Sequence, residues 1–545
     1  MPETSGRARG WVLPAVTGVA SVAFGVGIGE LAAAVLAPAS GPFVVVGSLL
    51  IDLAPPWAKD AAIALFGTAD KAALLVGIGL VLVAVAGAAG VLEARRPPWG
   101  RVLVGLLGVV GAIAASTRAN ASMLAIAPSA IAAIGAVVAL QLLVRRLPGT
   151  DAAAATRPAG ATRPAGATRP AGATRPAGAT RPAGATRPAG EVDRRRFLGW
   201  AGGAAAIGAI AALGGNALQA GSRAVTAIRE TITLPRPTAS ATVPASAELG
   251  IAGVAPVVTP NAQFYRIDTA LAVPAVDPAG WSLRIHGMVE REVSITWDEL
   301  IALPLEESVT TLACVSNEVG GGLIGNAVWL GYPIRELLAR AVPSADADMV
   351  LSRSVDGFTA STPLAVLEDD RNAILAIGMN GDPLPPEHGF PVRMVVPGLY
   401  GYVSATKWVV DLEVTRFDAA AAYWTTRGWS ERGPIKLQSR IDVPRSGQSL
   451  QAGPVTVAGV AWHQHVGIEA VDVQVDDGPW QPATLATAIS IDTWVQWRYD
   501  WDAPAGTHTL RVRATGADGE VQTSEVQGVV PDGATGLHER AVQLG

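Results

Sequence analysis

The stretch Thr310-Thr-Leu-Ala-Cys314-Val-Ser-Asn-Glu318-Val-Gly-Gly-Gly322 contains the only cysteine of the 545-residue chain. Its first residues favour a β-strand, and the glycines after Cys314 predict a loop in which backbone can approach a ligand closely. A lone cysteine is usually a small, buried apolar residue. Its thiolate is also a soft ligand that suits a heavy transition metal. These two roles are the alternatives for Cys314.

One thiolate cannot hold a metal alone, and no CxxC or HxxxH spacing supplies partner ligands. If Cys314 binds a metal, the ion must arrive with other ligands already attached, as an organic cofactor would bring them. The single cysteine also excludes an intramolecular disulfide, so the fold must be stable without one.

Short β-type runs and short helical patterns alternate from Val257 onward. The strand-like runs lie at 281–286 and 289–296, and the helical patterns lie at 297–303 and 334–341. Because there is no repeating βαβ rhythm and no GxGxxG motif, the pattern predicts an α+β domain and argues against a nucleotide-binding domain.

Further motifs lie on both sides of the cysteine. They are Thr259-Pro-Asn261, Phe264-Tyr265-Arg266, Trp329-Leu-Gly-Tyr-Pro-Ile334, Met379-Asn-Gly-Asp-Pro-Leu384, His388-Gly-Phe-Pro-Val-Arg393, Tyr400-Gly-Tyr402 and Thr406-Lys407-Trp408. With these motifs, residues 257–530 resemble the sulfite-oxidase family of molybdenum enzymes, and the sequence around Cys314 resembles its bacterial membrane-bound branch. The resemblance implies a molybdenum–molybdopterin cofactor.

The resemblance also assigns roles to single residues. Cys314 would be the protein ligand to molybdenum. His388, Arg393 and Lys407 would hold the pterin and its phosphate, a role that makes chemical sense because an anionic phosphate needs Arg and Lys donors. The alternative for each Arg or Lys is a surface ion pair.

Three more residues are expected near the metal. Arg266 would lie beside it as a catalytic residue that binds an anionic substrate or the cofactor. Asn317 and Ser316 would donate hydrogen bonds there.

Two positions depart from the family pattern. Ile267-Asp268 stands where the better-known sulfite oxidases have Asn-His, which removes a pterin contact. Trp429 stands at the place of their active-site tyrosine. These differences put sulfite as the substrate in doubt but do not challenge the cofactor.

Residues 451–530 show period-2 alternation in short runs separated by turns, which predicts a β-sandwich. The module resembles the immunoglobulin-like dimerisation domain of the same family, so a homodimer through this module is expected. His463 and His465 lie within it. Because no third ligand is close in sequence, we interpret them as polar surface residues rather than as a metal site.

Apolar residues make up 50% of the chain and are concentrated before residue 147. Four segments there have or approach the ~20 apolar residues that a helix needs to cross a bilayer. They lie at 11–37, 72–92, 101–117 and 121–144, and a fifth lies at 197–218. Segment 42–54 is short and ends at two prolines, so we interpret it as re-entrant or interfacial.

Arginine clusters predict the orientation, because cytoplasmic loops carry the excess of positive charge. The clusters near residues 7–9, 95–101, 145–146 and 194–196 all fall on one side if the chain crosses four times and then once more. This predicts a multi-pass protein of the cytoplasmic membrane with everything after about residue 218 outside. Glu30, within the first span, is either a functional carboxylate or a helix cap.

Residues 155–190 repeat Ala-Thr-Arg-Pro-Ala-Gly six times. Such a segment has almost nothing to bury, which predicts a disordered cytoplasmic linker. The following Arg194-Arg195-Arg196 resembles a twin-arginine export signal, or it serves only to orient the next span.

These patterns predict a multi-domain protein with an N-terminal α-helical membrane bundle, an α+β molybdopterin domain and a C-terminal immunoglobulin-like β-sandwich. The expected parts are a four-span membrane domain (1–146), a linker (147–193), a fifth span (194–219), an exposed stalk (220–254), the cofactor domain (255–447), the sandwich (448–532) and a tail (533–545).

The expected function is oxidoreduction by two-electron oxygen-atom transfer, with a small oxyanion or S-oxide as substrate. The alternatives are a reductive enzyme for sulfoxides or similar S- or N-oxides, and a cofactor-free surface module on a membrane anchor. Since no histidine precedes His286 and no CxxCH is present, electrons must pass to another protein or a quinone. The net charge of -5 and the lack of a basic patch give no indication of nucleic-acid binding.

Overall fold

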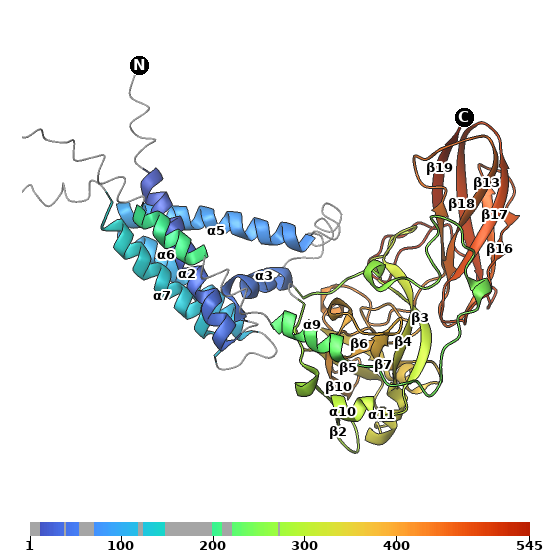
Figure 1. Cartoon of the computed structure of the whole chain (residues 1–545), viewed down its shortest axis with the longest axis horizontal. Helices are drawn as coiled ribbons and strands as arrows, with labels where there is room; N and C mark the ends of the chain where they lie inside the picture. The colour runs from blue at the N-terminus through green and yellow to red at the C-terminus, as the bar shows by residue number, and fades with distance from the viewer. Residues whose placement is uncertain are drawn as a thin grey trace, which may run out of the picture. The chain divides into compact units, whose positions relative to one another are not determined.

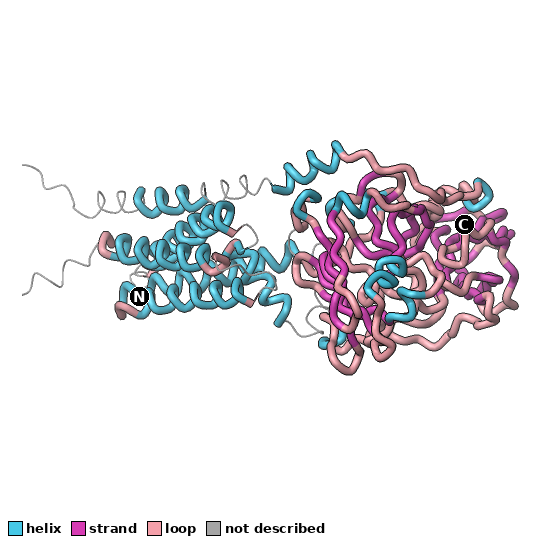
Figure 2. The backbone as a smooth tube through the Cα atoms, turned by 90° about the horizontal axis from the view of Figure 1, so that it is seen from below, coloured by secondary structure: helices cyan, strands magenta, loops and turns pink. Residues whose placement is uncertain are grey.

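The computed structural model describes residues 11–37, 40–53, 70–117, 124–147, 199–209, 221–270 and 273–545. These residues form two units, divided near residue 220. The first unit is helical, and the second contains all the described strands (Figures 1 and 2). The expectations for 147–193 and for the start and end of the fifth span fall largely outside the described residues.

The helical unit consists of α2 (Val12–Leu36), α3 (Pro42–Leu53), α5 (Asp70–Arg95), α6 (Trp99–Ser116) and α7 (Ala127–Val144), with residues 199–209 also helical. Four helices are long and apolar enough to cross a membrane, at 12–36, 76–95, 99–116 and 127–144. Helix α3 has only 12 residues, too few for a span. The described parts of the four main apolar segments therefore form helices as expected.

Small residues bring α2 close to its neighbours. A Cβ atom added at Gly18 would collide with the backbone of Ala86 on α5, and one added at Gly25 would collide with Ala132 on α7. Close backbone approach through glycine and alanine is typical of helices that associate in membranes, because van der Waals contact is their main source of attraction there.

Glu30 fits the capping alternative. Its Oε1 accepts a hydrogen bond from the backbone nitrogen of Phe43 at 3.0 Å, in the first turn of α3, where a carboxylate is favoured by the helix dipole. A second buried carboxylate, Glu93 near the end of α5, accepts from the backbone nitrogen of Arg101 at 3.0 Å and from its Nε at 2.7 Å. Both carboxylates therefore have structural partners.

One mixed sheet and one antiparallel sheet form the α+β part of the second unit. One sheet has the order β2 (Val293–Thr296), β1 (Ser282–Gly287), β10 (Val409–Thr415), β5 (Met349–Ser354) and β6 (Thr359–Pro363). The other has the order β3 (Glu306–Ala313), β4 (Ile324–Pro333), β7 (Ile374–Met379) and β8 (Asp382–Pro383), with β9 (Arg393–Val395) also paired to β7. The α-helices of this α+β part are α9 (Gly221–Thr231), α10 (Trp297–Ile301), α11 (Ile334–Ala341) and α12 (Leu364–Glu368).

Burial patterns explain these elements. In β1, Leu283 and Ile285 are buried while Ser282 and Arg284 are exposed, as expected for a strand with one face on the core. All six residues of β7 are buried, so its sequence reads as a continuous apolar run. Helix α10 begins with a capping box between Thr296 and Glu299.

The C-terminal part is the expected β-sandwich. Its four-stranded sheet has the order β11 (Gln438–Val443), β13 (Gly453–Trp462), β17 (Val495–Ala503) and β16 (Thr484–Leu485). Its five-stranded sheet has the order β12 (Ser449–Leu450), β19 (His538–Leu544), β18 (Gly506–Gly516), β14 (Ile468–Val475) and β15 (Gln481–Pro482). Inward residues of both sheets, such as Val457 and Val512, share one apolar core.

Two boundaries of the sandwich differ from the expectation. Strand β11 lies within the range 255–447 assigned to the cofactor domain, yet it pairs with β13. Residues 533–545 are not a tail, because β19 lies between β12 and β18. Buried apolar residues are sparse in these strands, which leaves only a weak alternation in the sequence.

The segment 220–254 is not an exposed stalk. The backbone nitrogen of Thr238 donates to the carbonyl of Leu305 at 2.7 Å, and Ala239 bridges to Glu306 at the start of β3. The backbone nitrogen of Leu249 donates to Oε1 of Gln496 at 2.7 Å. The small residues of segment 220–254 predicted that it would form no core of its own. Backbone hydrogen bonds nevertheless attach the segment to the domain surface.

The sandwich also packs directly on the α+β part. Trp462 and Trp494 belong to the same apolar cluster as the core of the α+β sheets. The indole nitrogen of Trp494 donates to the carbonyl of Val257 at 2.9 Å, and the backbone nitrogen of Thr311 donates to the carbonyl of Asp492 at 3.0 Å. The two folds therefore share a continuous core.

Candidate functional site

Cys314 directly follows β3, at the start of the glycine-rich loop that joins β3 to β4. The ends of this loop are held by a hydrogen bond from the backbone nitrogen of Cys314 to the carbonyl of Leu323 at 2.9 Å. Oδ1 of the buried Asn317 accepts from the backbone nitrogen of Leu323 at 2.7 Å. Gly320 has a φ of +76°, which favours glycine, and an added Cβ would collide with the ring of His538.

A cavity of about 890 Å³, including its open mouth, lies beside Cys314. Its size is within the range of small-molecule and cofactor sites. The lining residues come from the segment before β1, the cysteine loop, the end of β5 and the region between β7 and β11. They include Tyr265, Asp268, Cys314, Ser316, Asp356, Phe358, His388, Arg393, Tyr402, Lys407, Trp408, Trp424 and Trp429.

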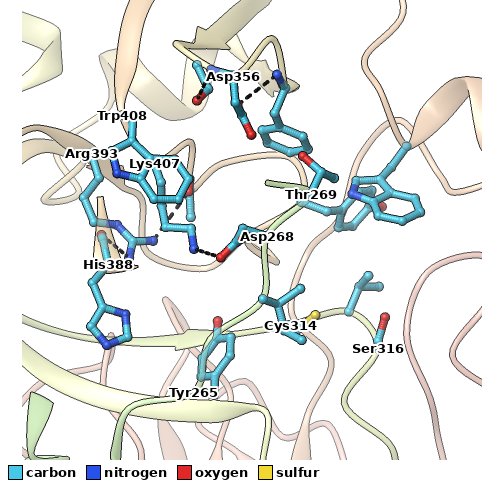
Figure 3. Close-up of a pocket in the computed structure, with 18 of the residues that line it drawn as sticks. Tyr265, Asp268, Thr269, Cys314, Ser316, Asp356, His388, Arg393, Lys407 and Trp408 are labelled. Atoms are coloured by element: carbon cyan, nitrogen blue, oxygen red, sulfur yellow. Dashed lines mark hydrogen bonds and ion pairs between the residues drawn. The ribbon is translucent and has the colours of Figure 1, made fainter. Parts of the chain in front are cut away.

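Figure 3 shows a division within this cavity. His388, Arg393, Lys407 and Trp408 lie on one side, and Cys314 with Ser316 lies on the other. Asp268 lies between them and points towards Lys407. The site thus has a cationic side and a thiol side.

Backbone pairing places the two cations next to each other. Arg393 on β9 forms an isolated antiparallel bridge with Lys407, and the backbone nitrogen of Met394 donates to the carbonyl of Thr406 at 2.9 Å. Gly389, with a φ of +114°, lies so close that an added Cβ would be 2.9 Å from the Cβ of Arg393. The spacing of the cations is therefore fixed by the main chain.

Arg393 is only 5% exposed. Among the described residues its guanidinium donates to three backbone carbonyls, those of Met394 at 3.3 Å, His388 at 3.2 Å and Ala405 at 3.4 Å. Burial lowers the pKa of Arg393 to about 10. A buried charge that meets only neutral acceptors is costly, so this position is suited to an anionic ligand.

Lys407 is buried and has a carboxylate partner. Its Nζ donates to Oδ2 of Asp268 at 2.7 Å and to the carbonyl of Glu387 at 3.1 Å. Burial lowers the pKa of Lys407 to about 8, and the attraction of Asp268 opposes that shift. The lysine is therefore charged at neutral pH and loses its proton in mildly alkaline solution.

His388 is buried beside these cations, with Nε2 at 3.2 Å from the carbonyl oxygen of Asn261. Burial, together with the positive charge of Arg393, lowers the pKa of His388 to about 4. The ring is therefore neutral at physiological pH. A carbonyl oxygen can only accept, so Nε2 carries the proton and Nδ1 can accept.

Burial raises the pKa of the Cys314 thiol, whereas hydrogen bonds from Ser316 lower it. A bound cation reverses the effect of burial, because coordination to a metal removes the proton of a thiol. The sulfur is thus a neutral group by itself and an anionic ligand beside a metal.

The structure brings together six of the residues singled out from the sequence. They all line the cavity and are Cys314, Ser316, His388, Arg393, Lys407 and Trp429. These include the cysteine expected to bind the metal and all three residues expected to hold the pterin.

Arg266 and Asn317 lie differently from the expectation. The side chain of Arg266 is 40% exposed, its Nε donates to Oδ2 of Asp268 at 2.9 Å, and the residue is not among those that line the cavity. Asn317 uses its side-chain oxygen to close the cysteine loop. Arg266 therefore contacts the cavity through Asp268, and Asn317 supports the loop from behind.

Several lining residues were missed from the sequence. Asp268 was interpreted only as the loss of a pterin contact, yet it is the carboxylate that pairs with Lys407 and Arg266. Tyr265 and Tyr402 lie within motifs that were quoted, so their positions offered a signal. Asp356 and Phe358 lie in a turn with no recognisable motif.

Comparison with known proteins agrees with this fold. Residues 270–424 match the oxidoreductase molybdopterin binding domain, and residues 438–512 match a bacterial Ig domain. Mitochondrial sulfite oxidase of Homo sapiens is 30% identical over 308 residues, covering 48% of this chain and 56% of that protein. The uncharacterized oxidoreductase YuiH of Bacillus subtilis is 32% identical over 160 residues, covering 29% of this chain and 76% of that protein.

The crystal structure of the sulfane dehydrogenase SoxCD from Paracoccus pantotrophus is similar with a TM-score of 0.47 at 22% identity, covering 55% of this chain and 88% of that chain. The chain spans about half the length of the mitochondrial sulfite oxidases that it matches.

The fold and the site define a molybdopterin-binding oxidoreductase domain followed by an immunoglobulin-like module. The chain belongs to the sulfite-oxidase family, and its cofactor is molybdenum–molybdopterin. Membership of this family argues against the alternative of a cofactor-free binding module.

Proposed function

We propose that this protein is a membrane-anchored molybdenum enzyme that transfers an oxygen atom to or from a small substrate in a two-electron reaction outside the cytoplasmic membrane. One observation carries the proposal. A single cavity has the chain's only thiol on one side and two buried cations on the other. That arrangement suits a ligand with a metal at one end and a phosphate at the other.

Arg393 and Lys407 are the proposed phosphate-binding residues. A phosphate would give Arg393 the anionic partner that it lacks among the described residues, and charge-assisted hydrogen bonds of this kind are the strongest that proteins make. His388, neutral and with Nδ1 free to accept, would receive a hydrogen bond from the pterin. Lys407 would contribute its charge only below about pH 8.

Asp268 has a separate role in this proposal. Its carboxylate pairs with Lys407 and Arg266, so in the folded chain it compensates part of the positive charge on the cationic side. A bound phosphate would compete with it for Lys407. We therefore propose that Asp268 adjusts how strongly the site holds an anion.

Cys314 is the proposed protein ligand to molybdenum. The bound cofactor would supply two-electron oxygen-atom transfer, which no amino-acid side chain provides. The hydrogen bonds that close the cysteine loop would fix the position of the sulfur. Ser316, beside the thiol, would orient it through its hydrogen bond.

Aromatic residues form the cavity wall contributed by the region between β10 and β11. Trp424 and Trp429 contact each other at 6.1 Å between ring centres, and Trp429 contacts Tyr402 at 5.9 Å. The hydroxyl of Tyr402 donates to the carbonyl of Ser430 at 2.8 Å, which fixes the ring. Such a wall would exclude water from the substrate.

The same wall favours the second candidate function, reduction of sulfoxides or similar S- or N-oxides. Among the described residues that line the cavity, Arg393 and Lys407 are the only Arg or Lys side chains, and both lie on the cationic side. A small oxyanion would find little positive charge beside the aromatic rings, whereas an S-oxide with an apolar substituent would find favourable contacts.

The decisive experiment measures metal and cofactor first. Purified full-length protein in detergent should contain about one molybdenum per chain by mass spectrometry, and acid should release the pterin. Protein that folds in a molybdenum-replete host but contains neither would overturn the proposal.

Turnover assays then separate the two functions. Sulfite oxidation would be followed with an artificial electron acceptor, and sulfoxide reduction would be followed with a reduced dye. Sulfite turnover without sulfoxide turnover supports the first function, and the reverse supports the second. Absence of both in molybdenum-loaded protein would remove both substrate classes.

The membrane arrangement is also part of the proposal. The four apolar helices support anchoring, and the arginine distribution favours a cytoplasmic linker and an outside catalytic domain. Reporters fused after residue 147 and after residue 545 should be located on opposite sides of the membrane. The electron partner, a protein or a quinone, and a homodimer through the sandwich belong to the same proposal.

A further inference from the structure

A second cluster of ligand-type side chains lies in the sandwich, apart from the cavity beside Cys314. His463 follows β13, and Asp518 and Glu520 lie in the turn after β18. One potential ligand atom from each residue lies within 4.8 Å of the other two. Two carboxylates and an imidazole in this arrangement are a common donor set for divalent metals.

The imidazole is the observation that distinguishes this cluster from an ordinary acidic turn. His463 is only 8% exposed, and its Nδ1 is completely buried without a hydrogen-bond partner in the described structure. A buried polar atom without a partner is rare and requires an explanation. Here Nδ1 borders the same small volume as Oδ1 of Asp518, so a cation bound there would provide the missing contact.

Gly516 keeps the space between these groups open. A Cβ atom added there would lie 2.7 Å from Nδ1 of His463 and 2.6 Å from Oδ1 of Asp518. Both atoms therefore border the same small volume, which a side chain at this position would fill. The glycine leaves that volume accessible to an ion.

The two turns that carry the donors are already joined. The backbone nitrogen of Ala517 donates to the carbonyl of Gly467 at 3.1 Å, and that of Gly516 donates to the carbonyl of Glu520 at 2.8 Å. The acidic turn is thus fixed beside the turn of His463. Donor atoms in a tetrahedral zinc site are about 3.4 Å apart, so the exposed carboxylates need to move only slightly.

We propose that His463, Asp518 and Glu520 bind one first-row divalent cation, with Zn²⁺ as the preferred ion and water completing the coordination. Imidazole nitrogen favours Zn²⁺ over Mg²⁺ and Ca²⁺, which prefer sites made entirely of oxygen. Binding there would correct the interpretation of His463 as a polar surface residue.

The position of the site suggests a structural role. His463 connects β13 of the four-stranded sheet to β14 of the five-stranded sheet, and the carboxylates follow β18 of the latter. The next residue, Gln464, donates to the carbonyl of Thr311 on β3 at 3.4 Å. An ion would therefore clip both sheets together at the end of the sandwich that contacts the strand leading to Cys314.

The test is a metal titration of the full-length protein in detergent after dialysis against a chelator. Zinc per chain would be measured by equilibrium dialysis and mass spectrometry, with molybdenum per chain as an internal reference. The wild-type chain should bind one zinc more than the double variant Asp518→Asn/Glu520→Gln, whose changes are on exposed residues. Zinc should also raise the melting temperature of the wild type but not that of the double variant.

Two further variants control the comparison. Glu525→Gln removes an exposed carboxylate a few residues away and should bind zinc as the wild type does. Gly516→Ala keeps all three donors and should weaken zinc binding at least tenfold by filling the space. Equal zinc binding by the wild type and the double variant would overturn the proposal, as would binding of Mg²⁺ in preference to Zn²⁺. Because molybdenum is counted separately, a failure here is distinguishable from a failure of the proposed catalytic site.

Discussion

The cofactor cavity and the sandwich each contain a buried arginine, and the two arginines have different hydrogen-bond partners. Arg393 is 5% exposed and Arg440 is 9% exposed. The guanidinium of Arg440 donates to Oδ1 of Asp442 at 2.6 Å and to the carbonyl of Gly321 at 2.8 Å. The guanidinium of Arg393 donates to three carbonyls and lies 5.1 Å from the ring centre of Trp329, and it has no carboxylate partner among the described residues. The two arginines are therefore similarly buried, but of the two only Arg440 has a carboxylate partner among the described residues.

This difference shows how a ligand site can be recognised from charges alone. A buried ion pair inside a fold is complete in itself, whereas a buried cation without a carboxylate is stable only if the rest of the protein compensates its cost. Folds retain such a residue where function requires it. The cavity thus has the charge pattern of a binding site, and the sandwich at Arg440 has that of a scaffold.

The largest effect is expected at the thiol side of the cavity. In Cys314→Ser the hydroxyl is a poor ligand for a soft metal, so turnover should fall to background while the protein stays folded. Loss of an outer-shell partner of a metal already costs about 10–100-fold, and loss of the ligand itself should exceed that range. Steady-state turnover checks the result, with melting temperature and pterin content as controls. Full activity in this variant would remove Cys314 as the metal ligand.

A matched pair of substitutions tests the comparison directly. In cofactor-free protein, Arg440→Met leaves Asp442 buried without its cation and should lower the free energy of unfolding by about 3–5 kcal/mol. Arg393→Met removes an uncompensated charge and should leave stability unchanged or raised, while pterin content falls. Denaturant unfolding and pterin release measure the two effects. Equal destabilisation by both variants would mean that Arg393 is a structural residue.

Acid stability gives a smaller effect that involves both regions. Burial lowers the pKa of His388 and of His538 to about 4, below the unfolded value of about 6.5. The unfolded chain therefore binds more protons between these pH values, so stability is complete above about pH 6.5 and falls towards pH 4. Each histidine contributes about 3 kcal/mol to this loss.

Replacing either histidine by glutamine should remove that histidine's contribution to the loss of stability at acid pH. Melting temperatures at neutral pH and at about pH 4.5 would measure that share. His388→Gln should also reduce pterin content, and much more than His538→Gln does, because His388 lines the cavity whereas His538 contacts only the loop behind Cys314. A similar loss of pterin in His538→Gln would contradict the division between the two regions.

The smallest effect concerns the pH range in which the cationic side holds an anion. Lys407 has a pKa lowered to about 8 by burial, so its charge, and the hold on a phosphate, declines above that pH. A bound anion raises this pKa again, which limits the loss to several-fold. Lys407→Arg cannot deprotonate in this range and should retain pterin at about pH 9. Identical retention curves for the variant and the wild type would exclude Lys407 as a phosphate ligand.

The sequence was most informative where chemistry and motif coincide. The order of elements, the sandwich and four cavity residues, Cys314, His388, Arg393 and Lys407, followed from local patterns and from the family resemblance. The apolar runs predicted the long helices of the first unit equally well, because a membrane-spanning helix requires a long uninterrupted apolar segment.

The sequence was least informative where the partner lies far along the chain. Asp268 gained its meaning only when the fold placed Lys407 beside it. The three ligand-type residues His463, Asp518 and Glu520 are brought together by strands of two different sheets. No local pattern contains such information, since pairing between distant strands is decided by the whole core.

Strand β19 has a consequence for how the enzyme matures. Its first residue, His538, packs against Gly320 in the cysteine loop, and Arg440 holds the neighbouring Gly321 from the sandwich. The cysteine loop is therefore supported by a strand that is synthesised long after Cys314. During synthesis the thiol is present before this support has formed, so we expect the molybdenum cofactor to be inserted after the whole chain has been synthesised. Truncation before β19 should yield a protein that binds its cofactor poorly.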